Sequence, residues 1–326
     1  MQAMIFRTPV EMPSQQLQLT PQSHTFFIGS CFADHIGQLM AECLPSKQVT
    51  VNPHGPLYNP VSIRQVLATY LPSGIAQPFD ESGFFETPEG EWRHWDYSTK
   101  FTAPTQEALA QMLRNDWLDV QKRFATAQTL FITFSTDHVY RLTQGRCTGH
   151  CVANCHKQPS RMFAESAESL EQLTALWTDF MQLLHHELPQ LQVVFTLSPY
   201  RYAKYGMHAN ALSKARLMLL IDTLCQQFDF AHYFPAYEIV TDELRDYRFY
   251  NTDMLHPSNQ AVNYIWERFT EWAFTDDLKK YACERTALLR AMQHRPIHAQ
   301  SDAHKAFLLK LEQKKKDFLR KWGNWE

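Results

Sequence analysis

The chain has 326 residues, of which 44% are hydrophobic and 20% charged. This composition is typical of a packed globular protein and excludes fibrous and intrinsically disordered chains. The formal net charge of −3 gives no overall field that would attract a nucleic acid, so we expect no nucleic-acid partner.

Targeting signals are also missing from the sequence. No apolar run of about 7 to 15 residues follows a basic stretch at the start, and no window of about 20 apolar residues occurs. We therefore expect a cytoplasmic protein with no membrane contact. Its seven cysteines, an odd number, are expected to be mostly free thiols in that reducing compartment.

Strand-like and helix-like periods alternate through most of the chain. Strands are predicted over 24–28, 48–51, 129–134, 192–199 and, for the last one, either 232–234 or 236–240. Helices are predicted over 31–43, from Ser62 onward, and over 105–125, 168–188, 209–228 and 258–273. Residues 70–104 and 137–153 have the pattern of hairpin insertions. This alternation implies right-handed crossovers and a parallel sheet covered on both faces, which is a three-layer α/β/α fold.

The end of the chain has a different pattern. After Thr275 only helical periods remain, so the predicted organisation is an α/β domain over 1–274 and a helical extension over 275–326. The extension is basic and carries an apolar stripe, made of Phe307, Leu308, Leu311, Phe318, Leu319 and Trp322. This stripe predicts packing on the α/β domain, with a homodimer contact or an anionic surface as the alternatives.

A Gly-Ser pair directly follows the first predicted strand, and ligands of open α/β sheets bind at the carboxyl ends of the strands. Gly29 permits a sharp turn, and the N-terminus of the next helix offers N–H groups to a developing oxyanion. Ser30 is therefore a candidate nucleophile. The alternative is that its hydroxyl only caps the following helix.

A serine nucleophile needs a base, and the base needs an orienting group. Asp253 and His256 lie three positions apart in a loop that ends at Pro257, which lets the carboxylate reach one imidazole nitrogen and leaves the other free. Asp229 and His232 have the same spacing, but His232 enters an apolar strand. The pattern alone leaves a structural or solvated histidine open at both places.

A cysteine-rich segment is a candidate metal site. Cys147, Cys151 and Cys155, with His150 and His156, have ligand-like spacing. A period of four along a strand instead places the thiols on one face, and no second half of a metal motif follows. We expect free thiols, no metal and, since a P-loop and a dinucleotide fingerprint are absent, no cofactor.

Five ordered motifs resemble the GSCFA family, which is named after the string from Gly29 to Ala33. They are FFIGSCFADHIGQLM, NPHGPLYNP, VANCHKQP, TLSPYRY with NALSKARLMLLI, and YFPAYEIVTDELRDYRFYNTDMLHPSNQAVNYIWERF. The resemblance covers about residues 20 to 272 and leaves out the extension. It implies the flavodoxin-like fold of the SGNH (GDSL-like) hydrolases, with Ser30 as nucleophile, His256 as general base and Asp253 as its orienting carboxylate.

The resemblance also implies an oxyanion hole made by the serine N–H, a glycine N–H after the second strand and an asparagine side chain. Ser30 and Gly55 match the first two. The third strand is followed by Ser135-Thr136-Asp137 instead of Gly-x-Asn, so Asn154 is the expected third donor. Substrate contacts are also expected from His156. Arg201 and Lys214 flank the end of the fourth predicted strand and could bind an anionic substrate group, with structural ion pairs as the alternative.

The expected function is that of a serine hydrolase acting on small acyl esters, such as O-acetyl groups on carbohydrate. A non-catalytic module of the same fold that binds a glycan or a protein, and an acyltransferase working at the same site, remain alternatives. A metal protein built on the cysteine-rich segment is the third alternative.

Overall fold

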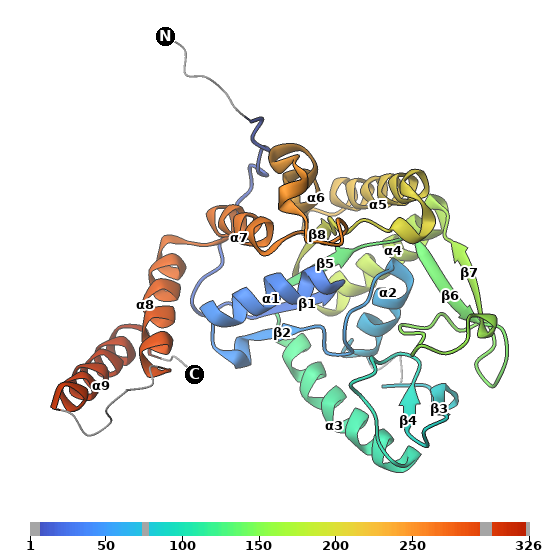
Figure 1. Cartoon of the computed structure of the whole chain (residues 1–326), viewed down its shortest axis with the longest axis horizontal. Coiled ribbons are helices and arrows are strands. Elements are labelled where there is room, and N and C mark those ends of the chain that lie inside the picture. The colour runs from blue at the N-terminus through green and yellow to red at the C-terminus, as the bar shows by residue number, and fades with distance from the viewer. Residues whose placement is uncertain (1–6, 74–77, 294–301, 324–326) are drawn as a thin grey trace, which may run out of the picture.

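The computed structural model describes residues 7–73, 78–293 and 302–323 (Figure 1). Five parallel strands form the central sheet in the order β2-β1-β5-β8-β9. They are β1 (Thr25–Gly29), β2 (Val49–Val51), β5 (Thr129–Phe134), β8 (Gln192–Leu197) and β9 (Ala231–Tyr233). Counted along the chain, this order is 2-1-3-4-5, as in flavodoxin-like folds. The predicted parallel sheet is confirmed.

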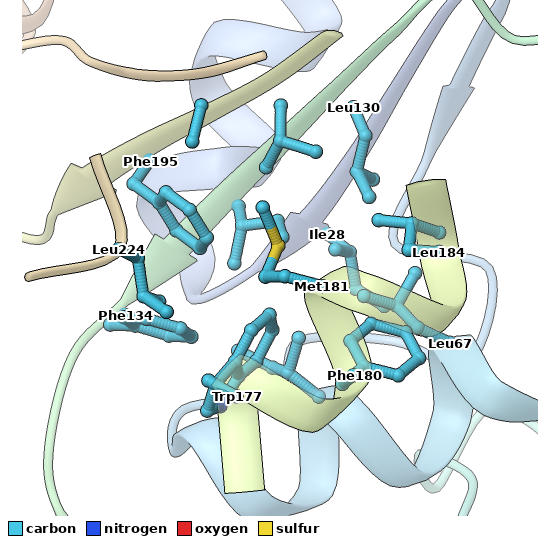
Figure 2. Packing of buried hydrophobic residues seen from close by; sticks show 14 of the residues in the cluster. Ile28, Leu67, Leu130, Phe134, Trp177, Phe180, Met181, Leu184, Phe195 and Leu224 are labelled. Carbon is cyan, nitrogen blue, oxygen red and sulfur yellow. The ribbon is translucent and has the colours of Figure 1, made fainter. Parts of the chain in front are cut away.

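Helices cover both faces of the sheet, so the predicted three-layer α/β/α architecture is confirmed as well. One face carries α2 (Pro60–Thr69), α3 (Gln106–Ala125), α4 (Leu170–Glu187) and α5 (Met207–Gln227). The other carries α1 (Cys31–Cys43) and α7 (Asn259–Ala273). Figure 2 shows Trp177, Phe180 and Met181 of α4 packed with sheet residues such as Ile28 and Phe195.

Both cores follow from the strand sequences. Successive strand residues point to opposite faces, so Phe26 and Ile28 enter one core while Phe27 enters the other. Every residue of β1 and β5 is buried, as expected for a parallel sheet with two covered faces. The continuous apolar runs therefore mark central strands.

The first insertion is the predicted hairpin, formed by β3 (Phe84–Glu86) and β4 (Trp92–His94). The second insertion differs from the prediction. β6 (His138–Leu142) pairs along its length with β7 (Phe163–Ala167). The predicted partner over 147–153 reaches β6 only through three backbone hydrogen bonds and one bridge, between Arg141 and Cys151. The stretch between the two strands turns repeatedly, through positive φ angles at Gly145, Gly149 and His156, which a regular strand cannot contain.

One local prediction was corrected, and of the two alternatives for the last strand the one over 232–234 is confirmed within one residue. The second helix begins at Pro60 and is capped by Asn59, whose Oδ1 accepts from Ser62 N–H at 2.8 Å, because proline suits the first helical position. The last strand is Ala231–Tyr233, and Ala236–Glu238 is the short helix α6. Shorter helical turns occur at Ser46–Gln48, Glu81–Gly83, Ser160–Met162, Ala203–Tyr205, Ile239–Leu244 and Tyr247–Phe249.

The extension folds as α8 (Asp276–Met292) and α9 (Asp302–Trp322), at the end of the molecule far from the β6–β7 hairpin (Figure 1). Leu311 and Phe318 of the predicted stripe are buried in the core shared with α1 and α7, whereas Leu308 and Leu319 are exposed. Arg285 fastens α8 to the end of α1 by donating to Glu42 O at 2.7 Å. Within the described residues, no helix has the length and apolar character needed to cross a bilayer.

Candidate active site

Ser30 lies at the turn between β1 and α1. Gly29 has a φ of +141°, and a Cβ there would lie 2.3 Å from Thr133 O, so only glycine lets β5 approach this closely. The Ser30 side chain accepts from Phe32 N–H at 3.3 Å and caps α1. Ser30 is 0% exposed, which means that its hydroxyl is closed off from solvent in this form.

The place of Ser30 in the sheet is that of a ligand site. β1 pairs with β2 on one side and with β5 on the other. The helix that follows β1 covers one face, and α4, which follows β5, covers the opposite face. The strand order therefore reverses between β1 and β5, where open α/β sheets bind their ligands.

Asn52 holds the Ser30 turn in place, and sequence reasoning missed it. Its Oδ1 accepts from Gly29 N–H at 2.8 Å, and its Nδ2 donates to Asp34 Oδ1 at 2.7 Å and to Ser30 O at 3.4 Å. Burial raises the pKa of Asp34, and the hydrogen bond from Asn52 acts against that shift. The signal was available: Asn52 is the first residue after a predicted strand and opens the NPHGPLYNP motif.

Gly55 and Asn154 were expected to complete the oxyanion hole. The Gly55 N–H instead donates to Asn52 O at 2.8 Å, and a Cβ at Gly55 would lie 2.4 Å from Ser98 Cβ, so this glycine serves close packing of its loop. Asn154 Oδ1 accepts from His156 N–H at 2.7 Å, and its Nδ2 group has no hydrogen-bond partner among the described residues. Asn154 thus keeps a donor, while Gly55 does not.

His156 is a buried structural residue in this form. Its Nε2 lies 3.0 Å from His94 O, and its Nδ1 is buried with no hydrogen-bond partner in the described part of the chain. Burial lowers the pKa of His156 to about 4, so the ring is neutral at pH 7. The expected contact of His156 with substrate would therefore require a conformational change that exposes the ring.

Asp253 and His256 form the pair that their spacing predicted. Asp253 Oδ2 lies 2.5 Å from His256 Nδ1, and Asp253 Oδ1 accepts from the backbone N–H groups of Leu255 and His256. These hydrogen bonds lower the pKa of Asp253 to about 2, the ring contributing most. His256 is 41% exposed at its side chain, and among the described residues none hydrogen-bonds to its Nε2.

Two residues after β8 position this loop against the strand ends. The ring of Tyr200 lies 4.4 Å, centroid to centroid, from that of His256. Burial raises the pKa of Tyr200, and so does the charge of Asp253. Arg201 binds the same loop by donating from its backbone to Leu255 O and from Nη1 to Met254 O.

Ser30 and His256 are not joined directly. Among the hydrogen bonds of the described residues, none connects the two side chains, and the one bond of the Ser30 hydroxyl is accepted from Phe32 N–H. The loop with Asp253 and His256 belongs to the same edge of the sheet. In this form, however, no hydrogen bond of the described residues could carry a proton from Ser30 to His256. General-base contacts often tighten only in the substrate complex.

Lys214 was expected, like Arg201, either to bind an anionic substrate group or to form a structural ion pair, and the structure gives it backbone partners instead. It is 2% exposed, and its Nζ donates to Ser135 O at 2.6 Å and to Ser198 O at 2.7 Å, which clamps the ends of β5 and β8 together. Burial lowers the pKa of Lys214 to about 7, while Asp137 and Cys31 act in the opposite direction. The Lys214 amine, just behind the edge where Ser30 lies, is therefore only partly protonated at neutral pH.

Asp137 stands near the position where the SGNH pattern has its asparagine. Its buried carboxylate pairs with Arg216, and its N–H donates to Ser213 Oγ at 3.2 Å. Ser213, Lys214 and Arg216 of α5 therefore all hold the loop after β5. Asp137 is thus part of a fixed support, which accounts for a carboxylate at this place.

The cysteine-rich segment shows no arrangement suited to a metal. Within the described residues, no group of three or more His, Cys, Asp or Glu side chains is placed to hold an ion. Burial raises the pKa of Cys147, that of Cys151 to about 12 and that of Cys155 to about 11, so all three are protonated thiols. Cys147 donates to Ser82 O at 2.7 Å and helps to join the two insertions.

Comparison with known proteins gives two matches along the chain. The model of the GSCFA family matches residues 24–269, and that of the GSCFA domain protein, C-terminal domain, matches residues 286–326. The extension, which the sequence motifs had left outside the resemblance, is therefore matched as well. Neither the comparison with curated proteins nor that with solved structures gave a significant match.

Proposed function

The chain belongs to the GSCFA family, and on that premise we propose that it is a serine hydrolase of the SGNH type that cleaves small acyl esters, such as O-acetyl groups. The observation that carries the proposal is the Asp253–His256 hydrogen bond at 2.5 Å, with Nε2 of the ring unpaired within the described chain. A base oriented in this way beside the edge that holds Ser30 suits nucleophilic catalysis.

In the proposed mechanism, His256 takes the proton of Ser30, and Ser30 Oγ attacks the carbonyl carbon of the ester. His256 then gives this proton to the leaving alcohol, and water hydrolyses the acyl-enzyme with the same base. The Ser30 hydroxyl must first leave Phe32 N–H, which frees that N–H, at the positive end of α1, for the oxyanion. Asn154 Nδ2 is the second proposed donor.

A non-catalytic binding module is the second candidate, and the complete burial of Ser30 favours it. The hydroxyl acts as a helix cap in this form, which is the structural role that the sequence had left open. Acyl transfer to another alcohol would use the same residues as hydrolysis, with an alcohol replacing water in the second step.

The experiment compares two variants that each lose a helix cap. Ser30→Ala removes the cap of α1, and Ser169→Ala removes the cap of α4 on the opposite face. Both changes are expected to cost about 1 kcal/mol of stability. Only Ser30→Ala should abolish turnover of 4-nitrophenyl acetate and labelling by a fluorophosphonate probe.

Three outcomes separate the candidates. Loss of labelling in Ser30→Ala but not in Ser169→Ala supports the hydrolase. Equal turnover in all three proteins, or no turnover and no labelling of the wild type, rejects catalysis at Ser30. An added alcohol that raises the rate and appears as its acetyl ester identifies a transferase.

A further inference from the structure

A hollow of about 270 Å³ lies beside the loop that carries Asp253 and His256. It is lined by two arginines, two tyrosines and three other residues, which are Arg201, Arg245, Tyr247, Tyr250, Val240, Thr241 and Asp246. Its volume is slightly below that of pockets for drug-sized ligands, so it fits one small ring or a charged substituent.

The hollow and the histidine loop share a wall. Tyr250 forms an antiparallel bridge with Pro257, and Asn251 N–H donates to His256 O at 2.8 Å. Arg201 reaches the loop from the other side through its bond to Met254 O at 3.1 Å. A group bound in the hollow therefore lies next to the base of the proposed reaction.

The lining supplies arginine side chains and tyrosine ring faces whose contacts with the rest of the protein are long or few. The Arg201 guanidinium lies 5.8 Å from the ring centroid of Tyr247 and 5.4 Å from that of Tyr250. Tyr247 is 64% exposed, which is unusual for a large aromatic residue that only supports the fold. The Arg245 side chain is 79% exposed, and its nearest approach to Asp242 is 3.8 Å.

The single carboxylate in the lining is committed elsewhere. Asp246 Oδ1 accepts from Arg248 N–H at 2.9 Å, and Asp246 Oδ2 faces Arg248 Nε at 3.9 Å. Arg245 also has a φ of 27°, a left-handed conformation that residues other than glycine seldom adopt. Such outliers often occur at ligand sites.

We propose that this hollow binds an anionic group, a carboxylate or a phosphate, on the alcohol part of the ester. The planar guanidinium of arginine matches both anions through paired N–H donors, and the tyrosine faces suit the ring that carries the anion. The proposal rests on the proposed hydrolase function and narrows its substrate class to esters of anionic alcohols or phenols.

The test uses acetate esters that differ in charge: methyl 4-acetoxybenzoate is neutral, 4-acetoxybenzoate carries a carboxylate, and 4-acetoxyphenyl phosphate carries a phosphate. Arg245→Ala is the test variant, because Arg201 also holds the histidine loop. Arg248→Ala removes the same charge from the same segment but outside the lining, and it keeps the backbone N–H that bonds to Asp246 Oδ1. We expect Arg245→Ala to lower kcat/KM for the anionic esters, relative to the neutral one, by about 3- to 10-fold.

The matched control makes the result decisive. Arg248→Ala should leave the ratio of anionic to neutral turnover unchanged. An equal fall in both variants would show a general charge effect and overturn the proposal, as would an unchanged ratio in Arg245→Ala. The anion whose ratio falls more in Arg245→Ala identifies the carboxylate or the phosphate as the preferred group.

Binding without turnover separates this proposal from the hydrolase function. Phenol, 4-hydroxybenzoate and phenyl phosphate are titrated into wild type, Arg245→Ala and Arg248→Ala by calorimetry. Anion-selective binding that is lost only in Arg245→Ala supports the site even if no ester is hydrolysed. Turnover that depends on Ser30 but has no preference for anions, together with no anion binding, removes the site and leaves the hydrolase.

Discussion

His256 and three buried histidines occupy opposite environments. His256 lies in an exposed loop, paired with the carboxylate of Asp253. His54, His94 and His156, which we call the buried histidine cluster, each place one ring nitrogen near a backbone carbonyl oxygen. Burial lowers the pKa of all three, to about 4 for His54 and His156. Burial thus favours the neutral form of these three rings, against the smaller opposing effect of the carbonyl bonds, whereas His256 is an exposed ring oriented by a carboxylate.

Replacing His256 should remove activity but not stability, and replacing a buried histidine should remove stability but not activity. The loss of activity is the largest effect that we expect. His256→Gln should lower ester turnover by about 10²- to 10⁴-fold, which is about 3 to 5.5 kcal/mol in the barrier, because a general base is removed. Its unfolding midpoint should stay near that of wild type, since the side chain is 41% exposed and packs in no buried core of the described chain.

His54→Gln should have the reverse effect, a loss of stability without a loss of activity. Its ring stacks on Tyr97 with centroids 3.8 Å apart and bonds to Asp96 O at 2.9 Å. The change should cost about 1 to 3 kcal/mol of stability, by urea unfolding, and leave the rate per folded molecule close to that of wild type. A His54→Gln protein that is stable but inactive would contradict the claim that His54 stabilises the fold and takes no part in catalysis.

Acid should destabilise the protein through the buried histidine cluster. A histidine with a pKa of about 4 in the folded state and about 6.5 in the unfolded state binds fewer protons when folded, so stability is lost as the pH falls below 6.5. For His54 and His156 the loss at pH 5 is about 2 kcal/mol each relative to pH 7 or above.

Urea unfolding at pH 7 and at pH 5 measures this loss. The His54→Gln variant should lose less stability than wild type between the two pH values, because one titrating group is gone. An identical loss in both proteins would mean that other groups control the acid response.

Asp96 gives a smaller effect with the opposite sign in pH. Its Oδ1 lies 2.6 Å from His150 Nε2, and this hydrogen bond raises the pKa of His150. A raised pKa adds stability that is complete below about pH 6.5 and is lost as the pH rises through the folded-state value. Asp96→Asn should therefore cost about 1.5 kcal/mol at pH 6 and less at pH 9, by urea unfolding. A cost that grows with pH would contradict this assignment.

Local patterns predicted most of the fold. The strand over 129–134 and the helix over 106–125 with its Thr105 cap were predicted at these residues, because an apolar run and a capping residue act within one segment. The main partner of β6 was missed, since the pairing with Phe163–Ala167 spans a loop with several left-handed residues. Pairing across such a loop leaves no periodic signal.

In the candidate site, too, features within one segment were predictable and features that join separate segments were not. The Asp253–His256 bond was predictable because both residues belong to one turn. Asn52, Tyr200 and Lys214 come from separate segments, and only the folded sheet brings them to one edge. The burial of Ser30 depends on what packs over the turn, which no local spacing encodes.

His232 tests whether environment, rather than spacing, selects the base, with the smallest expected effect. It shares the Asp-x-x-His pattern through Asp229, but its Nε2 lies 2.8 Å from Gln192 Oε1 at the edge of the sheet, and burial lowers its pKa. His232→Leu removes one hydrogen bond between half-buried side chains and should cost about 0.5 to 1 kcal/mol in urea unfolding. Ester turnover should be unchanged, because the ring contacts another strand and has no carboxylate to orient it. If His232→Leu lost turnover as His256→Gln does, the exposed pair at Asp253 would not be what distinguishes the base.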